Sequence, residues 1–180
     1  MVGLSSFGYN KTLQERNVPG IYDVDLLGYN LRMSEVAAGI GIEQIKKIKS
    51  FIKIRKENSI TIRSLLKEVK GITILPIKKN KSVSSNFCIN VVLDKKFSSI
   101  RNNLILKLKS RNLGTSVHYP ICLPYSKFYK GSKKNNDYAV ANHLAKSIIS
   151  LPCGPHINKN KSRKVAKIFI DSFKEITNAK

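Results

Sequence analysis

Residues 27–48 decide the architecture of this chain, and they read Leu27-Gly-Tyr-Asn-Leu-Arg-Met-Ser-Glu-Val-Ala-Ala-Gly-Ile-Gly-Ile-Glu-Gln-Ile-Lys-Lys-Ile48. A turn rich in hydrogen-bonding groups leads directly into an amphipathic helix. Ser34 is a favourable N-cap, and Glu35 places a negative charge in the first helical turn. Apolar residues then recur at helical spacing, at Val36, Ile40, Ile45, Ile48 and Ile52. The pattern therefore predicts a helix that begins at this turn.

The predicted helix is unusually long. The apolar stripe continues through Ile62, Leu66 and Val69, so we expect one helix, or two nearly collinear ones, over residues 34–69. At 1.5 Å per residue an unbroken helix of this length spans ~54 Å, whereas a compact domain of this size has a radius of gyration of only ~16 Å. Much of the helix is therefore expected to extend beyond its own domain and to require a partner surface.

The turn before the helix carries the first candidate site. Asn30 and Arg32 lie two residues apart beside a helix start, and this arrangement suits an anionic oxygen better than it suits a hydrophobic core. Gly39 and Gly41 resemble a fragment of a dinucleotide-binding motif, but Gln44 replaces the third glycine and no strand precedes them. Close packing of another backbone on this helix explains the small residues better.

The chain is strongly basic. It has 33 Lys and Arg residues against 11 Asp and Glu residues, which gives a formal charge of +22. Such a balance favours an anionic partner, namely nucleic acid, an acidic membrane or a phosphorylated small molecule. The charges are mostly lysines dispersed through a chain that is also rich in Asn and Ile, so a solvated surface explains them equally well. Composition alone leaves both interpretations open.

Cysteines and histidines do not predict a metal site. Cys88, Cys122 and Cys153 are isolated and odd in number, which supports neither a zinc site nor a disulfide framework and fits a reducing, cytoplasmic setting. No two histidines have metal-ligand spacing, and no Ser or Cys lies in a recognisable nucleophile motif. We expect no signal peptide and no membrane span, because the N-terminus lacks an apolar h-region and no apolar run is long enough.

The rest of the chain predicts an α/β fold, with a small sheet and helices packed on it. In chain order we expect strands at 72–75 and 86–93, a helix at 97–111, a strand at 115–121, and helices at 138–149 and 162–177. The inward-facing residues of the helices are predicted to be Ile100, Leu104, Ile105, Leu108, Val165, Ile168, Phe169 and Phe173. Gly71 and the Asn112–Gly114 segment are expected to end the helices that precede them.

His118 and Tyr119 form the second candidate site. They come at the end of a predicted strand and precede Pro120, so they are placed to direct polar groups into a cleft. An ordinary strand end is the alternative, and spacing alone favours it. His143 in an Ala-rich helix and His156 in a Pro/Gly loop are best explained as structural or surface histidines.

The opening stretch also carries a family resemblance. Gly28-Tyr29-Asn30-Leu31-Arg32-Met33 resembles the G-Y-N-x-R-M block of the DegT/DnrJ-type sugar aminotransferases, which are pyridoxal-phosphate enzymes that aminate nucleotide-linked ketosugars. Three further segments, residues 15–24, 113–120 and 144–152, are similar to blocks that occur in the same order in that family. The resemblance therefore extends over essentially the whole chain.

The resemblance implies that the chain is the C-terminal part of a type I aminotransferase fold. Residues 1–33 would be an interface loop left from the large domain, residues 34–69 a long interdomain helix, and residues 70–180 a small α/β domain. Asn30 would reach across a homodimer to the phosphate of the pyridoxal 5'-phosphate held by the other subunit, with Arg32 beside it. Tyr29, His118 and Tyr119 would bind substrate near the sugar cleft.

The resemblance also implies what this chain does not contain. The family's Schiff-base lysine, the Asp that pairs with the pyridine nitrogen and the group that stacks on the ring lie upstream of the G-Y-N-x-R-M block, so no catalytic residue is assigned here. Cys122-Leu123-Pro124 stands where members often have a His, which leaves the substrate contacts there open. The complete enzyme would transfer an amino group from an amino acid, such as glutamate, to a nucleotide-linked ketosugar, and this chain alone would not.

Two other functions remain open from the sequence. A basic nucleic-acid-binding module would explain the charge and the Tyr and Phe residues, but no recognition motif is present and the charge does not gather on one helix face, so we expect no specific nucleic-acid binding. The other possible function is that of a non-catalytic subunit, which pairs with a full-length aminotransferase and supplies Asn30. The partner would accordingly be an aminotransferase subunit or the missing N-terminal half.

Overall fold

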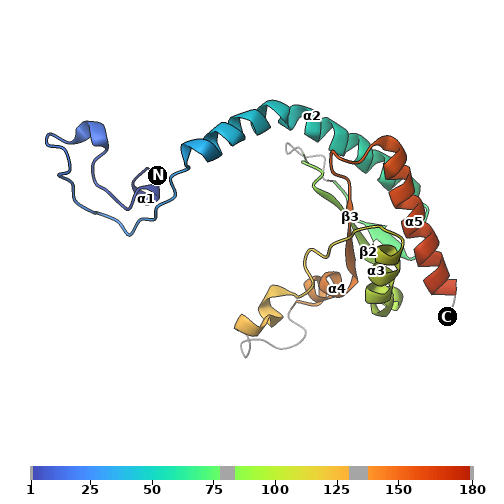
Figure 1. Cartoon of the computed structure of the whole chain (residues 1–180). Helices are drawn as coiled ribbons and strands as arrows, with labels where there is room; N and C mark the ends of the chain where they lie inside the picture. The colour runs from blue at the N-terminus through green and yellow to red at the C-terminus, as the bar shows by residue number, and fades with distance from the viewer. Residues whose placement is uncertain (1, 78–83, 130–137, 179–180) are drawn as a thin grey trace. The chain divides into compact units, whose positions relative to one another are not determined.

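The structure is a computed structural model that describes residues 2–77, 84–129 and 138–178 (Figure 1). The chain divides into two compact units, residues 1–48 and residues 49–180. Within these described segments, no helix is both long enough and apolar enough to span a bilayer.

The first unit is built on backbone pairing between two stretches, residues 4–10 and residues 23–31. The amide of Tyr29 donates to the carbonyl of Leu4 at 2.8 Å, and the amide of Asp25 donates to the carbonyl of Gly8 at 3.0 Å. A Cβ atom on Gly28 would lie 2.1 Å from the backbone nitrogen of Gly8, so only glycine permits this close approach. Two short helices, α1 (Val2–Ser5) and η1 (Leu13–Glu15), complete the loop.

The long helix α2 runs unbroken over Glu35–Leu66. Ser34 caps it as predicted, because its side-chain oxygen accepts a hydrogen bond from the amide of Ala37 at 3.3 Å. The helix ends before residue 69, the predicted limit, and Gly71, with φ of 93°, lies beyond its end in the turn to the first strand.

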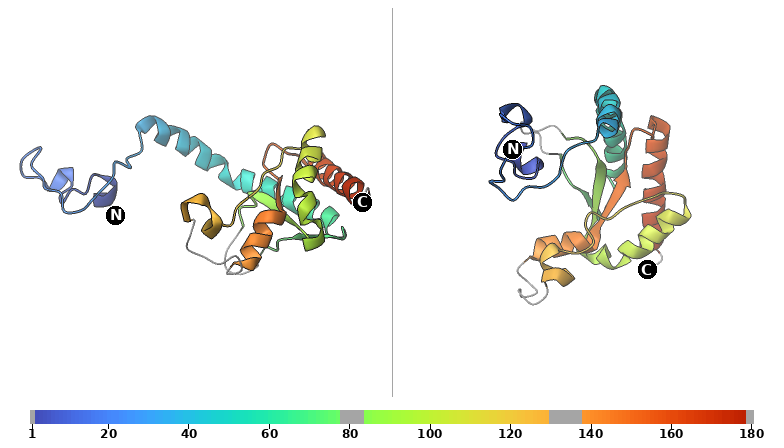
Figure 2. Two further views of the ribbon diagram at one scale, coloured as in Figure 1. Left: turned by 90° about the horizontal axis from the view of Figure 1, so that it is seen from below. Right: turned by 60° about the vertical axis from the view of Figure 1, so that its left-hand side comes forward.

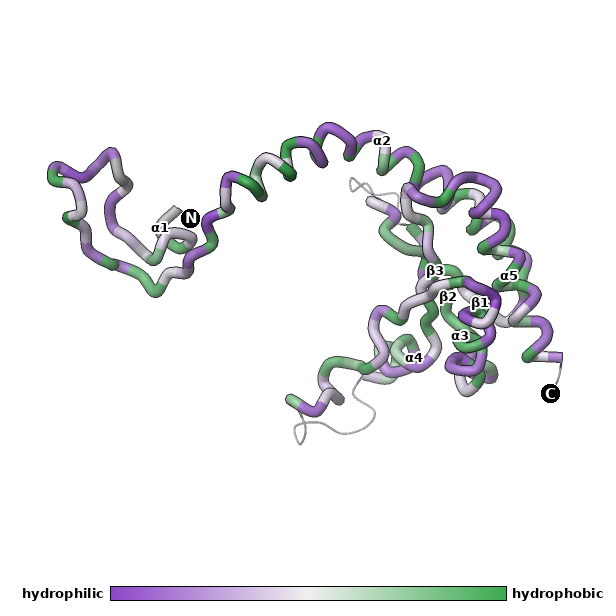
Figure 3. Tube along the Cα trace, viewed as in Figure 1, coloured by the Kyte–Doolittle hydropathy of each residue, from purple (hydrophilic) through white to green (hydrophobic). Residues whose placement is uncertain are grey.

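The two halves of α2 differ in burial. In the first half the apolar stripe is exposed, with accessibilities of 75% at Val36 and 68% at Ile45. Near the C-terminal end Ile62 and Leu66 are almost completely buried, at 0% and 1%. Apolar and polar residues alternate along the whole helix (Figure 3), so the difference lies in what packs against it.

The second unit contains a three-stranded antiparallel sheet in the order β1-β2-β3. The strands are β1 (Ile72–Ile74), β2 (Cys88–Leu93) and β3 (Ile148–Pro152). In this register Ile72 lies opposite Leu93, and Asn90 lies opposite Ser150. The first two strands confirm the predictions for 72–75 and 86–93.

The predicted third strand is wrong. Residues 115–121 form only an isolated bridge, between Ser116 and Ser150, and the third strand is β3 instead. The preceding helix α4 (Ala139–Ser147) therefore stops before residue 149, where the prediction ended it. Ile148 and Ile149 are β-branched, and the residue before Pro152 disfavours helix, so this apolar run extends and pairs with β2.

The core lies between one sheet face and three helices, the C-terminal part of α2, α3 (Arg101–Ser110) and α5 (Lys159–Asn178) (Figures 1 and 2). The inward-facing residues predicted for the helices are confirmed: Ile100, Leu104, Leu108, Val165, Phe169 and Phe173 are buried, and Ile105 and Ile168 pack against them. The first turn of the expected 97–111 helix belongs instead to a 3-10 helix, η2 (Lys95–Ile100). Two further short 3-10 helices, η3 (Leu123–Tyr125) and η4 (Lys127–Tyr129), follow.

A buried amide is one of the links between α2 and the rest of this unit. Asn58 is 2% exposed, and its Nδ2 donates to the carbonyl oxygens of Gly154 at 3.1 Å and Ile157 at 2.7 Å. Its Oδ1 accepts from the hydroxyl of Ser162 in α5 at 2.8 Å. The side chain therefore satisfies polar groups on the β3–α5 connection and on α5 at the same time.

We expect Asn58→Ala to lower the free energy of unfolding by about 1–3 kcal/mol, because the carbonyl of Ile157 loses its donor at 2.7 Å, and the Gly154 carbonyl and the Ser162 hydroxyl each lose one of two partners. Urea unfolding followed by circular dichroism measures the change. Asn103→Ala, at an exposed position of α3, is the matched control and should change the free energy by no more than about 0.5 kcal/mol. Equal losses in the two variants would contradict the role of Asn58.

An ion-pair cluster joins α3 to α5. The carboxylate of Glu175 accepts hydrogen bonds from Lys107, at 2.8 Å, and from the guanidinium of Arg111. These hydrogen bonds, the one from Lys107 first, lower the pKa of Glu175 below its ordinary value of 4.5. The carboxylate therefore contributes stability that is fully present above about pH 4.5 and is lost as the pH falls through the lowered pKa.

Glu175→Gln should make the unfolding free energy less dependent on pH below about 4.5 than in the unsubstituted chain, because the variant has no carboxylate to protonate. The urea concentration at the unfolding midpoint, measured at intervals of about one pH unit between pH 3 and pH 7, gives this pH dependence. Asp171→Asn removes the same charge one turn earlier on α5 and controls for net charge. Parallel pH curves for Glu175→Gln and the unsubstituted chain would contradict the prediction.

Candidate functional site

The first candidate site is the turn that precedes α2 in the first unit. Tyr29, Asn30 and Arg32 are all exposed there. Nε of Arg32 donates a hydrogen bond to Oδ1 of Asn30 at 3.1 Å, and the guanidinium lies 5.1 Å from the ring of Phe7. The predicted pair is therefore joined by a side-chain hydrogen bond, and an aromatic ring supports the cation.

The chemistry of this pair suits a phosphate group. Because Oδ1 of Asn30 accepts the bond from Arg32, the Asn30 amide is oriented by that bond and carries its N–H donors on the other atom. Arg32 adds the N–H groups of its terminal nitrogens, which match the geometry of oxyanions. An exposed amide donor beside an exposed guanidinium fits the phosphate of pyridoxal 5'-phosphate, the cofactor that the sequence resemblance implies.

The second candidate site surrounds His118 in the second unit. Nδ1 of His118 lies 3.9 Å from Sγ of Cys88, and Nε2 lies 3.2 Å from Oγ of Ser116. Two further residues extend the network, since Oδ1 of Asn90 accepts from the hydroxyl of Ser150 at 2.7 Å and from the thiol of Cys88 at 3.5 Å. The five polar side chains form one network on β2, β3 and the segment before His118.

One tautomer of neutral His118 satisfies all the contacts of this network. The carbonyl oxygen of Asn90 can only accept, so the thiol proton of Cys88 points to it, and Sγ is left to accept from Nδ1–H of His118. Nε2 is then the acceptor for the hydroxyl of Ser116. The imidazole is thus held on both sides, whereas the neighbouring Tyr119 is 76% exposed.

Sequence reasoning found His118 and missed its partners. The signal that could have found them is the alternation in β2, where Cys88 and Asn90 interrupt an otherwise apolar strand on one face. The predicted residues fall into two clusters, with Tyr29, Asn30 and Arg32 in the first unit and His118 and Tyr119 in the second. His143 bonds to Ser147 within α4, as expected of a structural histidine.

No described lysine lies in a pocket suited to covalent attachment of a cofactor. Every described lysine is exposed except Lys107, which is ion-paired with Glu175, whereas a lysine that carries a cofactor covalently needs a desolvated pocket. Burial raises the pKa of the Cys153 thiol to about 11, which keeps it protonated. Across the segments the structure describes, no three His, Cys, Asp or Glu side chains gather as metal ligands.

Comparisons with known proteins identify relatives that match most of this chain. The model of the DegT/DnrJ/EryC1/StrS aminotransferase family matches residues 1–169. Among the relatives is a UDP-4-amino-4,6-dideoxy-N-acetyl-beta-L-altrosamine transaminase from Helicobacter pylori, which is 26% identical over 84% of this chain and 40% of its own length. A dTDP-4-amino-4,6-dideoxy-D-glucose transaminase from Escherichia coli is 29% identical over 79% of this chain and 39% of its own length. The chain thus spans about 40% of the length of these relatives.

Solved structures show the same fold. Helicobacter pylori PseC, an aminotransferase involved in the biosynthesis of pseudoaminic acid, superposes with a TM-score of 0.81 at 23% identity and covers 97% of this chain and 45% of its own. The sugar aminotransferase Spr1654 from Streptococcus pneumoniae reaches a TM-score of 0.85 at 21% identity, over 97% of this chain and 44% of its own. The fold is that of the C-terminal part of these aminotransferases, and the chain belongs to the DegT/DnrJ/EryC1/StrS aminotransferase family.

Proposed function

We propose that this chain is the C-terminal portion of a pyridoxal-phosphate-dependent aminotransferase that acts on nucleotide-linked ketosugars in amino-sugar and surface-polysaccharide biosynthesis. The observation that carries the proposal is the hydrogen-bonded pair of Asn30 and Arg32 on an exposed turn, within a chain of this family. Relatives whose names specify nucleotide-sugar transaminases support the substrate class.

In this proposal the first cluster binds the cofactor of another subunit. The amide of Asn30 donates to a phosphate oxygen of pyridoxal phosphate, and Arg32 holds the adjacent negative charge. The cofactor, when bound, supplies the electron sink for amino transfer. Tyr29, His118 and Tyr119 contact the sugar nucleotide, with His118 held in one orientation by Cys88 and Ser116.

The covalent attachment of the cofactor comes from outside these residues. All described lysines but Lys107 are exposed, and the chain corresponds to about 40% of its relatives' length. The exposed apolar stripe on the first half of α2, with 61% accessibility at Ile40 and 50% at Ile48, supports a surface that packs against an aminotransferase large domain or subunit. The chain would therefore be inactive by itself and active only within the complete, homodimeric enzyme or when paired with a full-length aminotransferase subunit.

The 180-residue chain mixed with pyridoxal phosphate should form no stoichiometric covalent adduct. Borohydride reduction followed by peptide mass spectrometry should find low labelling spread over many lysines, at the level of a free-lysine control, because exposed amines are fully hydrated and protonated. A single lysine labelled close to stoichiometry would contradict the proposal, since the chain would then contain its own cofactor lysine.

Asn30→Ala combined with Arg32→Ala should weaken cofactor retention in a complex with a full-length family aminotransferase. We expect about a tenfold loss of pyridoxal phosphate affinity, because two charge-assisted hydrogen bonds to the phosphate are removed. Co-purification followed by a cofactor titration measures it. Lys11→Ala with Asn17→Ala removes one cation and one amide from exposed positions of the same unit and serves as control. Equal affinities of the two complexes would refute the assigned role.

A further inference from the structure

A cleft of about 440 Å³ in the second unit is lined by three segments that are far apart in sequence. They are the end of α3 with the following loop (residues 111–114), the connection from β3 to α5 (Pro152, His156 and Ile157), and one face of α5. Its volume lies within the range of small-molecule sites, roughly 300–1,000 Å³. None of its lining residues belongs to the cofactor or substrate clusters proposed above.

The cleft has an apolar floor and a cationic rim. Leu113, Ile157 and Val165 form the floor and are 5%, 6% and 7% exposed. The rim carries the exposed side chains of Lys161 and Lys164. No carboxylate is among the described residues that line the cleft. This combination differs from a generally basic surface, because charge is gathered over a buried apolar patch.

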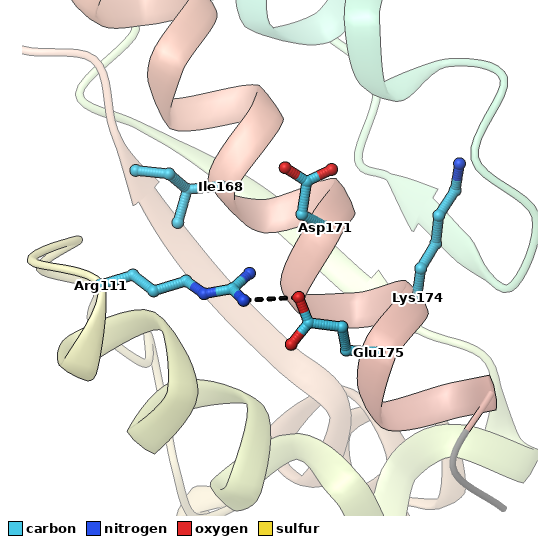
Figure 4. A pocket seen from close by; sticks show the side chains of 5 residues that line it. All are labelled: Arg111, Ile168, Asp171, Lys174 and Glu175. Atoms are coloured by element: carbon cyan, nitrogen blue, oxygen red, sulfur yellow. Dashed lines mark hydrogen bonds and ion pairs between the residues drawn. The ribbon is translucent and has the colours of Figure 1, made fainter.

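In the adjacent cavity, which α5 also lines, the positive charge of Arg111 is neutralised by a carboxylate. This cavity is lined by Arg111, Ile168, Asp171, Lys174 and Glu175, and the guanidinium of Arg111 turns toward Glu175 (Figure 4). Arg111 also donates to the hydroxyl of Ser172 at 3.1 Å. Arg111 is thus an engaged cation on the wall between the two cavities, while Lys161 and Lys164 belong only to the cleft without carboxylates.

The position of the two lysines on α5 adds to the unbalanced charge. They are three residues apart, so they lie on the same helix face, where like charges repel. They also lie in the first two turns of a 20-residue helix, near the positive end of its dipole. Asn158 accepts the amide of Lys161 at 2.9 Å and so caps this end without adding negative charge. A bound anion would relieve this repulsion.

We propose that this cleft binds a small organic phosphate, with its phosphate held by Lys161 and Lys164 and an apolar ring lying on Leu113, Ile157 and Val165. Exposed His156 borders the same cleft and adds a ring donor at the rim. The proposal assigns a local role to part of the chain's +22 charge. It does not depend on pyridoxal phosphate or on the sugar nucleotide.

The test uses 1-naphthyl phosphate as the probe for the full chain, with isothermal titration at near-physiological salt, where the Debye length of about 8 Å screens diffuse charge. Inorganic phosphate and 1-naphthol supply the two halves of the probe separately. We expect saturable binding of 1-naphthyl phosphate that is about tenfold tighter than either half, because only the whole probe uses both rim and floor.

Lys161→Gln with Lys164→Gln should weaken this binding about tenfold. Lys53→Gln with Lys56→Gln is the matched control, because it removes two exposed lysines at the same spacing from α2 and changes the net charge equally. The control should bind within about twofold of the unsubstituted chain. Equal losses in both variants, or binding that does not saturate, would show a diffuse charge effect and overturn the proposal.

Discussion

In the second unit, the packing of the C-terminal half of α2 depends on a buried polar contact. Two arginines on the C-terminal half of α2 donate to carbonyl groups beside the sheet, Arg55 to Phe87 at 3.0 Å and Arg63 to Leu75 at 2.8 Å. The buried Asn58 restricts the helix further, because its amide must face the carbonyls of Gly154 and Ile157 and the hydroxyl of Ser162 together. A buried amide that loses its partners is costly, so it selects one arrangement of helix, connection and α5.

The helices could be predicted from local pattern, and the sheet only in part. Periodicity at 3.6 residues identified α2, α3 and α5, because α3, α5 and the C-terminal part of α2 each bury one face, although the stripe on the first half of α2 is exposed. The run at 148–152 is buried on both faces, and a short apolar run of this kind has no period that distinguishes a strand from a helix end. Tertiary pairing with β2 decided between them, and the segment around Ser116 was left with one bridge.

The two candidate sites also differ in whether local sequence or tertiary structure brings their residues together. Asn30 and Arg32 are close in sequence and bond to each other, so a local motif was enough to place them together. The environment of His118 comes from β2, β3 and Ser116, and it exists only because the register sets Asn90 opposite Ser150. Strand register is a property of the whole sheet, which explains why sequence reasoning named the histidine and not Cys88 or Asn90.

The backbone pairing of residues 4–10 with residues 23–31 has a consequence for binding. Asn30 is positioned by amide–carbonyl bonds of its neighbours, such as Leu31 to Ser5 at 3.0 Å, and by the contact of Gly28 with Gly8, none of which involves a ligand. The turn therefore loses its conformational entropy when the chain folds and not when a ligand binds. In the proposed function, a phosphate bound at Asn30 would have only to orient side chains, so more of its interaction energy would be retained as affinity.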